Sequence, residues 1–500
     1  MKTPRPRWLK RKAYVHFFNP PRLLDAQIIE RVMDPAWVKQ RSFLPLLHFS
    51  IIEHRYRRPF DSFSNKRSSQ RTYKAKQRQI FYADHMDAHV LAYYAHLLDE
   101  KLQKQHYDDS RLNEEVIAYR RIPRTSGRGC KCNIDFAKEV FDFIRADKRD
   151  ALTVLCLDIT DFFPSLKHRT LKREWYRLLD RTDLPDDHYA IFKSVTRYRY
   201  VEISDVLQQI PRPGLEYYRL LRQKRKGSKQ RITSLCENRT EFVQHVVKAG
   251  LVKAPLEKGG RPSSKGIPQG TPISATLSNL YMLSFDQRMS ELVYQVGGMY
   301  RRYSDDILIV CPPASAERLA ENARAAIRDL DLIIKPEKTQ VVQFVRNADG
   351  WSIRSFYDGS ALRPGKELSY LGFDFNGKRT IIRNSSISKF YRKLKLQIRR
   401  AAGYANMVKA LQLKGLYQKA EPKIYRRSIY RSRTNFGAKS KRFVDKDGRQ
   451  IQDWGNYLTY VKRAARIMNE PAIKRQVRNH QRKVDRMIRG LELRYGLKRR

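Results

Sequence analysis

The chain has 500 residues, of which 41% are apolar, so it is long enough for two to four globular domains and is not a disordered protein. Its 102 lysines and arginines exceed its 51 aspartates and glutamates. The resulting formal charge of +51 predicts a polyanionic partner such as nucleic acid. No apolar run approaches the roughly 18 residues of a spanning helix, and we find no signal peptide, so we expect a cytoplasmic protein with no membrane partner.

The first part of the chain mixes basic, aromatic and helical patterns. Residues 76–102 predict one amphipathic helix. The apolar residues spaced for one face of this helix are Met86, Val90, Tyr93 and Leu97. Residues 115–123 are strand-like and end in Arg120 and Arg121. A basic loop with glycine follows, and then a helix over 134–144. Paired guanidinium groups suit a triphosphate, although a basic surface hairpin is the simpler interpretation of this stretch alone.

Residues 151–157 are almost all apolar, which predicts a central strand buried on both faces. Asp158 comes directly after this run, and Asp161, Phe162 and Phe163 follow. A carboxylate directly after a buried strand lies where layered α/β domains place their active sites. An aspartate that only caps a turn is the alternative for this motif by itself.

The chain is polar and strongly basic from about residue 195 to 262, most of all over 219–231. We interpret this stretch as an insertion whose cations follow a nucleic-acid backbone. Such a charge run is often only a solvated face, but in a chain of charge +51 we favour nucleic acid.

Residues 259–289 begin as a Gly/Pro/Ser loop that contains Lys265 and Gln269. A helix follows, for which Thr271 is the expected N-cap and Pro272 the first residue. Small residues ahead of a helix N-terminus let a base pair and its phosphates approach closely. A loop that merely caps the helix is the alternative.

Residues 299–311 consist of two β-prone runs around a short polar step, which is the pattern of a hairpin. Asp305 and Asp306 lie at its tip. Adjacent carboxylates repel one another there unless a divalent cation neutralises them. An ordinary solvated turn is the alternative for this pair on its own.

The expected elements beyond this hairpin are a helix over 315–330, a strand over 333–344, a second hairpin over 368–382, a cationic helical region from about 385 and a last helical pair over 454–489. The strand carries Lys335 and Lys338, and the second hairpin turns at Asn376 and Gly377. The apolar stripe of the cationic region is Ile387, Tyr391, Leu394, Ile398 and Ala401 or Ala402.

Three of these motifs, in this order, resemble the palm of reverse transcriptases. The motifs are LDITDFFPSL (157–166), similar to the first carboxylate motif, KGIPQGTPISATLSNLYM (265–282), similar to the Pro-Gln-Gly motif, and YSDD (303–306), similar to the Tyr-X-Asp-Asp box. Lys338 with Thr339 and LSYLGF (368–373) resemble later palm motifs. The resemblance covers about residues 118–375.

This resemblance implies an α/β (α+β) fold, with a right-hand polymerase palm and fingers and a mostly α-helical, thumb-like C-terminal domain. The divisions that we expect are an N-terminal extension and fingers over 1–150, a palm over 151–345 that includes the basic insertion, a hairpin that ends the palm over 346–384, and a basic helical domain over 385–500.

The resemblance also implies the chemistry of the site. Two Mg²⁺ ions, with Mn²⁺ as a substitute, would be held by Asp158, Asp305, Asp306 and the carbonyl group of Ile159. The residues that it places around the incoming nucleotide are Arg120, Arg121, Asp161, Phe162, Phe163, Gln269 and Lys338. Phe163 would lie under the sugar and clash with a 2′-hydroxyl, so we expect dNTPs to be preferred. Lys338 is the expected partner of the leaving pyrophosphate, although Lys335 is close enough to take that role.

Among reverse transcriptases, the chain looks most like the bacterial defence-associated members, the abortive-infection and unknown-group lineage related to retrons. This implies an RNA-directed DNA polymerase that adds dNTPs to a 3′-hydroxyl and copies a companion noncoding RNA into a DNA product. It also implies an anti-phage role, as a homo-oligomer in the bacterial cytoplasm. Two alternatives stay open: template-independent or protein-primed DNA synthesis by the same site, and a catalytically idle RNA-binding scaffold.

Overall fold

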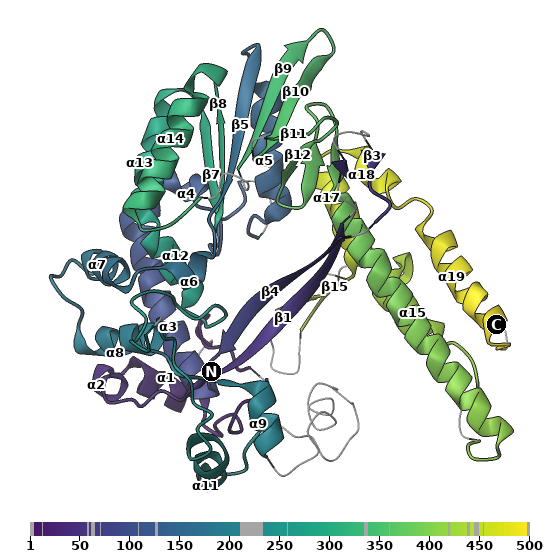
Figure 1. The fold of residues 1–500 in the computed structure, drawn as a ribbon, viewed down its shortest axis with the longest axis horizontal. Coiled ribbons are helices and arrows are strands. Elements are labelled where there is room, and N and C mark those ends of the chain that lie inside the picture. Colours follow the sequence, from purple (N-terminus) through teal and green to yellow (C-terminus); the bar gives the residue numbers. More distant parts are fainter. Residues whose placement is uncertain are drawn as a thin grey trace.

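The computed structural model describes residues 5–12, 14–57, 60–61, 66–70, 72–108, 110–125, 129–210, 234–257, 259–334, 339–359, 361–418, 421–437, 441–444, 450–453 and 455–497. The basic run 219–231, Lys335 and Lys338 lie outside them. Helices and antiparallel strands form one mixed α/β fold, which confirms the expected fold class (Figure 1). Among the helices in the described ranges, none is long and apolar enough to cross a membrane.

A six-stranded antiparallel sheet lies at the centre of the fold, in the order β11-β10-β9-β5-β8-β7 (Figure 1). Its strands are β5 (Ala151–Asp158), β7 (Met299–Tyr303), β8 (Asp306–Cys311), β9 (Gln340–Asn347), β10 (Gly350–Asp358) and β11 (Ala361–Leu362). The apolar strand β5 is central, between β8 and β9, as its sequence predicts. Successive side chains of a strand point to opposite faces. Leu155 and Leu157 therefore belong to one hydrophobic core, and Leu152 and Val154 to another.

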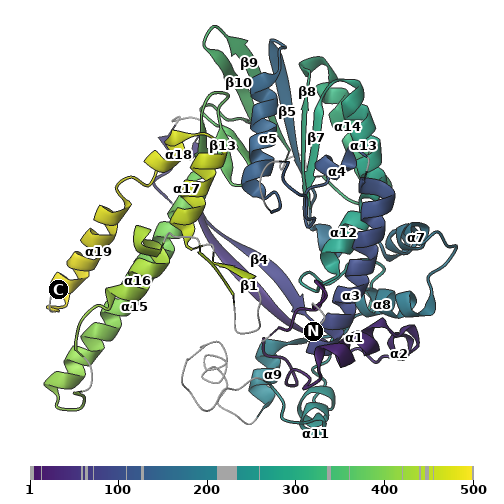
Figure 2. The same cartoon turned by 180° about the vertical axis from the view of Figure 1, so that it is seen from behind.

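Helices cover both faces of this sheet (Figures 1 and 2). The helices α13 (Leu283–Gln295) and α14 (Pro313–Asp329) share the core of Leu155, and α5 (Asn133–Ala146) shares the core of Val154. Neither face of β5 meets water, which is why the strand carries almost no polar residue before its last position.

A long hairpin, made of β1 (Leu46–Arg57) and β4 (Thr72–Tyr82), extends from the N-terminal helices toward the C-terminal helices (Figures 1 and 2). The short strand β6 (Tyr200–Glu202) pairs in parallel with the base of β1. At the far end of the hairpin, Lys389 Nζ lies 3.4 Å from the carboxylate of Glu53 on β1. The hairpin therefore bridges two parts of the molecule that lie far apart in the sequence.

The single helix expected over residues 76–102 is wrong. Its residues 76–82 belong to β4, and α3 (His85–Leu102) begins only where Asp84 accepts a hydrogen bond from the Met86 N–H at 3.1 Å. The face of α3 that is buried includes Tyr94 and Leu98, each one position after the expected Tyr93 and Leu97.

Two other expected elements also differ. Residues 115–123 form no named strand, because α4 (Leu112–Glu115) ends there and Val116 makes only an isolated bridge with Arg302. The helix expected to begin at Pro272 starts two residues later, as α12 (Ser274–Tyr281), because the Thr271 carbonyl first accepts the Ser274 N–H in a turn.

The C-terminal part begins with a three-stranded sheet and continues as helices. These elements are β12 (Leu368–Tyr370), β13 (Phe373–Phe375), β14 (Thr380–Ile382), α15 (Asn384–Leu413), α16 (Arg426–Arg433), α17 (Tyr457–Ile467), α18 (Pro471–Arg475) and α19 (His480–Arg494). The turn at Asn376 and Gly377 is confirmed between β13 and β14. Leu394 and Ile398 of α15 are buried as expected, and they pack against Val484 and Ile488 of α19. The expected last helical pair is three helices, α17 to α19.

The remaining helices and strands are α1 (Asp25–Met33), α2 (Pro35–Lys39), β2 (Phe60–Asp61), β3 (Lys66–Arg67), η1 (Gln103–Tyr107), α6 (Phe162–Ser165), α7 (His168–Leu178), α8 (Asp186–Thr196), α9 (Ile203–Gln209), α11 (Arg239–Phe242), η2 (Val243–Val247), η4 (Asn435–Gly437), β15 (Lys441–Val444) and β16 (Gln450–Asp453).

Candidate active site

The hairpin of β7 and β8 presents two carboxylates at its turn. Tyr303, the last residue of β7, pairs with Asp306, the first residue of β8, so Ser304 and Asp305 form the turn itself. Ser304 is in the left-handed region, at φ 63°, where a side chain is strained. The hairpin predicted from residues 299–311 is therefore confirmed, with the tightest type of turn at the acidic step.

The third carboxylate comes from the neighbouring strand. Asp158, the last residue of β5, lies directly opposite Asp306 in the antiparallel register of β5 and β8. Just beyond it, the Ile159 N–H donates a hydrogen bond to the Asp305 carbonyl at 3.2 Å. The fold thus brings together residues that are 147 positions apart in the chain (305 − 158), where β5 ends and β8 begins.

The electrostatics of the site are those of crowded carboxylates. Partial burial, together with the charge of Asp158, raises the pKa of Asp305 above its usual value. Partial burial and the charges of Asp305 and Asp158 raise the pKa of Asp306 to about 6. Both carboxylates therefore hold their negative charge at an electrostatic cost, which a bound cation would relieve.

The donors suit a hard divalent cation, since carboxylate and carbonyl oxygens are the ligands that Mg²⁺ prefers. In the parts of the chain that the structure describes, however, no three carboxylate, imidazole or thiol groups lie close enough together to hold a metal ion as they stand. The three aspartates would therefore have to draw closer to share an ion.

Two cations lie near these carboxylates that the sequence motifs do not indicate. Lys76, on β4, is close enough to lower the pKa of both Asp305 and Asp306, and Arg383, directly before α15, has the same effect on Asp306. Lys76 was missed because its segment was interpreted as a helix. The alternation of Lys74, Lys76 and Arg78 is the period-two signal of a strand, and it could have revealed this basic edge.

The loop of Gln269 connects two walls of the site. On one side the Ile267 N–H donates to the Phe163 carbonyl at 3.0 Å, and on the other the Gln269 carbonyl accepts the Phe81 N–H of β4 at 2.9 Å. Gly270 follows at φ +115°, and a Cβ there would lie 2.6 Å from the Phe81 carbonyl oxygen. The loop can pass this close to β4 only because residue 270 is a glycine.

The segment after Asp158 turns sharply into a short helix. Asp161 adopts φ 45°, and its left-handed turn reverses the chain into the short helix α6. Phe162 and Phe163 are buried, at 4% and 9% exposure, and their rings lie 5.5 Å apart. Phe163 thus stands between the carboxylates and the Gln269 loop.

The structure argues against Arg120 as a phosphate ligand. Its guanidinium donates to three backbone carbonyl groups, including that of Val116 at 2.8 Å, and to the side chains of Gln103 and Asn113. It also lies 3.7 Å over the ring of Tyr107. Burial lowers its pKa. Arg120 therefore fixes the local backbone, and of the two arginines only Arg121 is exposed.

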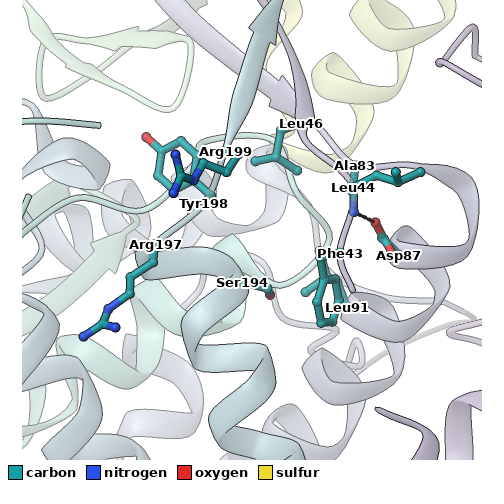
Figure 3. Close-up of a pocket in the computed structure, with 10 residues that line it drawn as sticks. All are labelled: Phe43, Leu44, Leu46, Ala83, Asp87, Leu91, Ser194, Arg197, Tyr198 and Arg199. Atoms are coloured by element: carbon teal, nitrogen blue, oxygen red, sulfur yellow. Dashed lines mark hydrogen bonds between the residues drawn. The ribbon is translucent and has the colours of Figure 1, made fainter. Parts of the chain in front are cut away.

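A cavity of about 80 Å³ lies away from the aspartates, near the base of the β1–β4 hairpin (Figure 3). Leu44, Leu46 and Leu91 form much of its apolar lining, and Arg197 and Arg199 lie at its edge. None of the predicted site residues lines it, so this cavity is separate from the candidate active site.

A family model described as reverse transcriptase (RNA-dependent DNA polymerase) matches residues 229–375. This part of the chain is therefore similar to reverse transcriptases. It contains Gln269, Asp305 and Asp306. Asp158 precedes it in the sequence and joins these residues through the pairing of β5 with β8.

Solved telomerase structures are also similar to this chain. The apo telomerase of Candida tropicalis, truncated from its C-terminal domain, is 9% identical, with a TM-score of 0.38 over 62% of this chain and 54% of that one. The telomerase of Candida albicans in complex with a TWJ fragment of telomeric RNA is 13% identical, with a TM-score of 0.35 over 76% of this chain and 52% of that one. The match thus spans about half the length of these structures. A sequence search of curated proteins finds no match.

Proposed function

We propose that the chain is an RNA-directed DNA polymerase, which joins a dNTP to the 3′-hydroxyl of a primer on an RNA template. The single observation that carries this proposal is the register of β5 and β8, which sets Asp158 opposite Asp306 beside Asp305. The similarity of residues 229–375 to reverse transcriptases supports it. An RNA-binding scaffold without catalysis would have no reason to keep three mutually repelling carboxylates at one edge of a sheet.

The reaction that we propose for this site is in-line transfer: the 3′-oxygen attacks the α-phosphorus, and pyrophosphate leaves with the electrons of the broken bond. Two Mg²⁺ ions, with Mn²⁺ as a substitute, would supply positive charge to the attacking and leaving oxygens when bound. Asp158, Asp305 and Asp306 would hold them, with the Ile159 carbonyl as a further oxygen ligand.

Other residues of the chain would hold the nucleotide. Lys76 faces the carboxylates from β4 and is placed to contact the triphosphate, together with the exposed Arg121. The backbone N–H groups of Asp161 and Phe162 would approach the phosphates. Lys338 remains the proposed partner of pyrophosphate from the sequence motif alone.

Phe163 and Gln269 would select the sugar and hold the base. The Ile267 N–H, in the loop of Gln269, donates a hydrogen bond to the Phe163 carbonyl, so the backbone segments of Phe163 and Gln269 are held together. An aromatic ring under the sugar would clash with a 2′-hydroxyl, and we therefore propose that Phe163 makes the chain use dNTPs in preference to rNTPs.

Primer extension on an RNA template tests this function. The isosteric double variant Asp305→Asn/Asp306→Asn should lose at least about 10³-fold in rate, because it removes two of the three carboxylates that stabilise the reaction. Asp349→Asn, which changes an exposed carboxylate in the β9–β10 turn, is the matched control and should retain wild-type rate. Equal incorporation by the double variant and the wild type would disprove the assignment.

We further propose, from the resemblance of the motifs, that the template is a companion noncoding RNA and that the protein acts in bacterial anti-phage defence, as a cytoplasmic homo-oligomer. Sequencing of the nucleic acids that copurify with the chain tests this. One structured RNA and DNA complementary to it would support the proposal. DNA that stays attached to the protein after phenol extraction and nuclease treatment would instead identify protein-primed synthesis.

A further inference from the structure

Arg302 is a fully buried arginine, with 0% of its surface exposed, three residues before Asp305 on β7. Its partner is Asp286 on α13, which is also 0% exposed. Arg302 Nε and Nη2 each donate to one carboxylate oxygen of Asp286 at 2.6 Å, in the bidentate geometry of the strongest ion pairs. Burial alone would lower the pKa of Arg302, but the Asp286 carboxylate raises it above its usual value. The guanidinium is therefore permanently charged.

The pair is part of a larger network of buried hydrogen bonds. The Tyr300 hydroxyl donates to Asp286 at 2.6 Å, and Arg302 Nη2 also donates to the Asn279 side chain on α12 at 3.3 Å. Asn279 in turn donates to the Ala118 carbonyl at 3.1 Å. The network thus joins β7 to two helices and to the segment that precedes Arg120.

The remaining nitrogen of the Arg302 guanidinium group takes no part in this network and contacts the turn between β7 and β8 instead. Arg302 Nη1 donates to the Ser304 carbonyl at 3.1 Å. Ser304 has φ 63°, a strained conformation that persists only where the surroundings hold it. A second contact supports the same residue, because the Tyr119 hydroxyl lies 3.1 Å from Ser304 Oγ.

We propose that Arg302 is a positioning residue, which holds the Ser304 carbonyl and thereby fixes the direction in which Asp305 presents its carboxylate. The inference rests on the proposed polymerase function and adds a residue to it that does not touch the substrate. The bidentate ion pair with Asp286 orients the guanidinium plane of Arg302 and so fixes the direction of Nη1.

Stability alone is a poor explanation of this pair. A buried ion pair often contributes no more than apolar side chains of the same volume, because both charges must be desolvated. What apolar side chains cannot do is donate a hydrogen bond to the turn. Replacement of the whole network by apolar residues therefore separates the two roles.

The test is the triple variant Arg302→Met/Asp286→Leu/Tyr300→Phe, which removes the charges and the tyrosine hydroxyl together and so leaves neither charge unpaired. On an RNA template, we expect kcat to fall about 10²-fold while the KM for dNTP stays within about 3-fold, because a displacement near 1 Å of a catalytic group has this effect on the chemical step. Arg302→Lys keeps a positive charge opposite Asp286 but lacks the branched guanidinium group. Its kcat should lie between that of the wild type and that of the triple variant.

Arg41→Met/Asp87→Leu is the matched control. It removes another ion pair with a buried carboxylate, in which Arg41 Nε and Nη2 lie 2.7 Å and 2.6 Å from the same Asp87 oxygen and which does not reach the turn. It should keep wild-type kcat. Wild-type kcat in the triple variant, beside the loss in Asp305→Asn/Asp306→Asn, would overturn the role of Arg302 alone. Wild-type activity in Asp305→Asn/Asp306→Asn would overturn the proposed function, and this inference with it.

Discussion

Two buried imidazoles, those of His16 and His89, carry a cost that depends on pH. Burial lowers the pKa of His16 to about 3, and burial with the charge of Arg11 lowers that of His89 to about 4. In the unfolded chain both side chains take up a proton near pH 6.5, so the unfolded state binds more protons below that value. Stability is therefore complete above pH 6.5 and is lost as the pH falls toward 4.

Each imidazole should remove about 1.4 kcal/mol of unfolding free energy per pH unit in this window. Urea unfolding between pH 7.5 and 4.5 measures the slope, and His89→Gln should reduce it. His96→Gln, on the exposed side of the same helix, is the control and should leave the slope unchanged. A slope that is equal in all three proteins would show that His89 is not the group responsible.

For single residues, the sequence predicts the positions of the acidic site residues in the fold better than those of the basic ones. Asp158 and Asp305 follow or interrupt apolar runs, so their positions in the fold can be deduced from local pattern. Nothing local distinguishes Arg120, which is buried against backbone carbonyl groups, from Arg121, which is exposed. The ion pair of Arg302 with Asp286 spans 16 positions and two elements, and so depends on tertiary packing.

At the scale of elements, the close contact between the Gln269 loop and β4 should depend on the glycine at position 270. Gly270→Ala places a Cβ 2.6 Å from the Phe81 carbonyl oxygen, in a backbone conformation that already strains any side chain. We expect a loss of about 1–3 kcal/mol in unfolding free energy and a higher KM for dNTP, since the loop must move away from β4.

Gly350→Ala, at the first residue of β10, is the matched control. Gly350 has φ +98°, but no atom lies within 4 Å of its added Cβ. It therefore incurs the backbone strain without the collision and should keep the wild-type KM. A KM change of equal size in both variants would show that the close approach to Phe81 does not matter.

Elements whose pattern is unmixed are predicted well, and mixed segments are not. The run of residues 151–157 predicts β5 because both faces are buried. Residues 76–102 join a strand to a helix without a glycine or proline between them, and only the Asp84 cap marks the boundary. The start of α12 was placed too early because Thr271 and Pro272 have the residue types of a helix start but form the preceding turn.

For the whole molecule, the contact of Glu53 with Lys389 links the β1–β4 hairpin to α15 and so bridges the N-terminal and C-terminal helices (Figure 2). An exposed ion pair contributes roughly 0.2–1 kcal/mol, which allows the link to open and re-form. We expect Lys389→Glu to shorten the DNA made in one binding event by roughly 2- to 5-fold.

The reversed pair Glu53→Lys/Lys389→Glu should restore the wild-type length, because it keeps the attraction and the net charge. Extension of a labelled primer in the presence of an unlabelled trap measures that length. A reversed pair that performs no better than Lys389→Glu alone would mean that Lys389 acts on nucleic acid and not through Glu53.

At this scale the sequence predicts the fold class and the order of the parts but not how they meet. The contact between Glu53 and Lys389 spans 336 positions, and neither residue belongs to a motif. The charge of +51 predicts a nucleic-acid partner but not where on the fold that partner binds.

The most direct test of the central claim is single-nucleotide addition by the wild-type chain opposite each of the four bases of an RNA template. Asp305→Asn/Asp306→Asn serves as the control. The account predicts that the template base determines which dNTP is added, and that the control adds none. Addition of the same nucleotide opposite every base, or equal addition by the control, would contradict it.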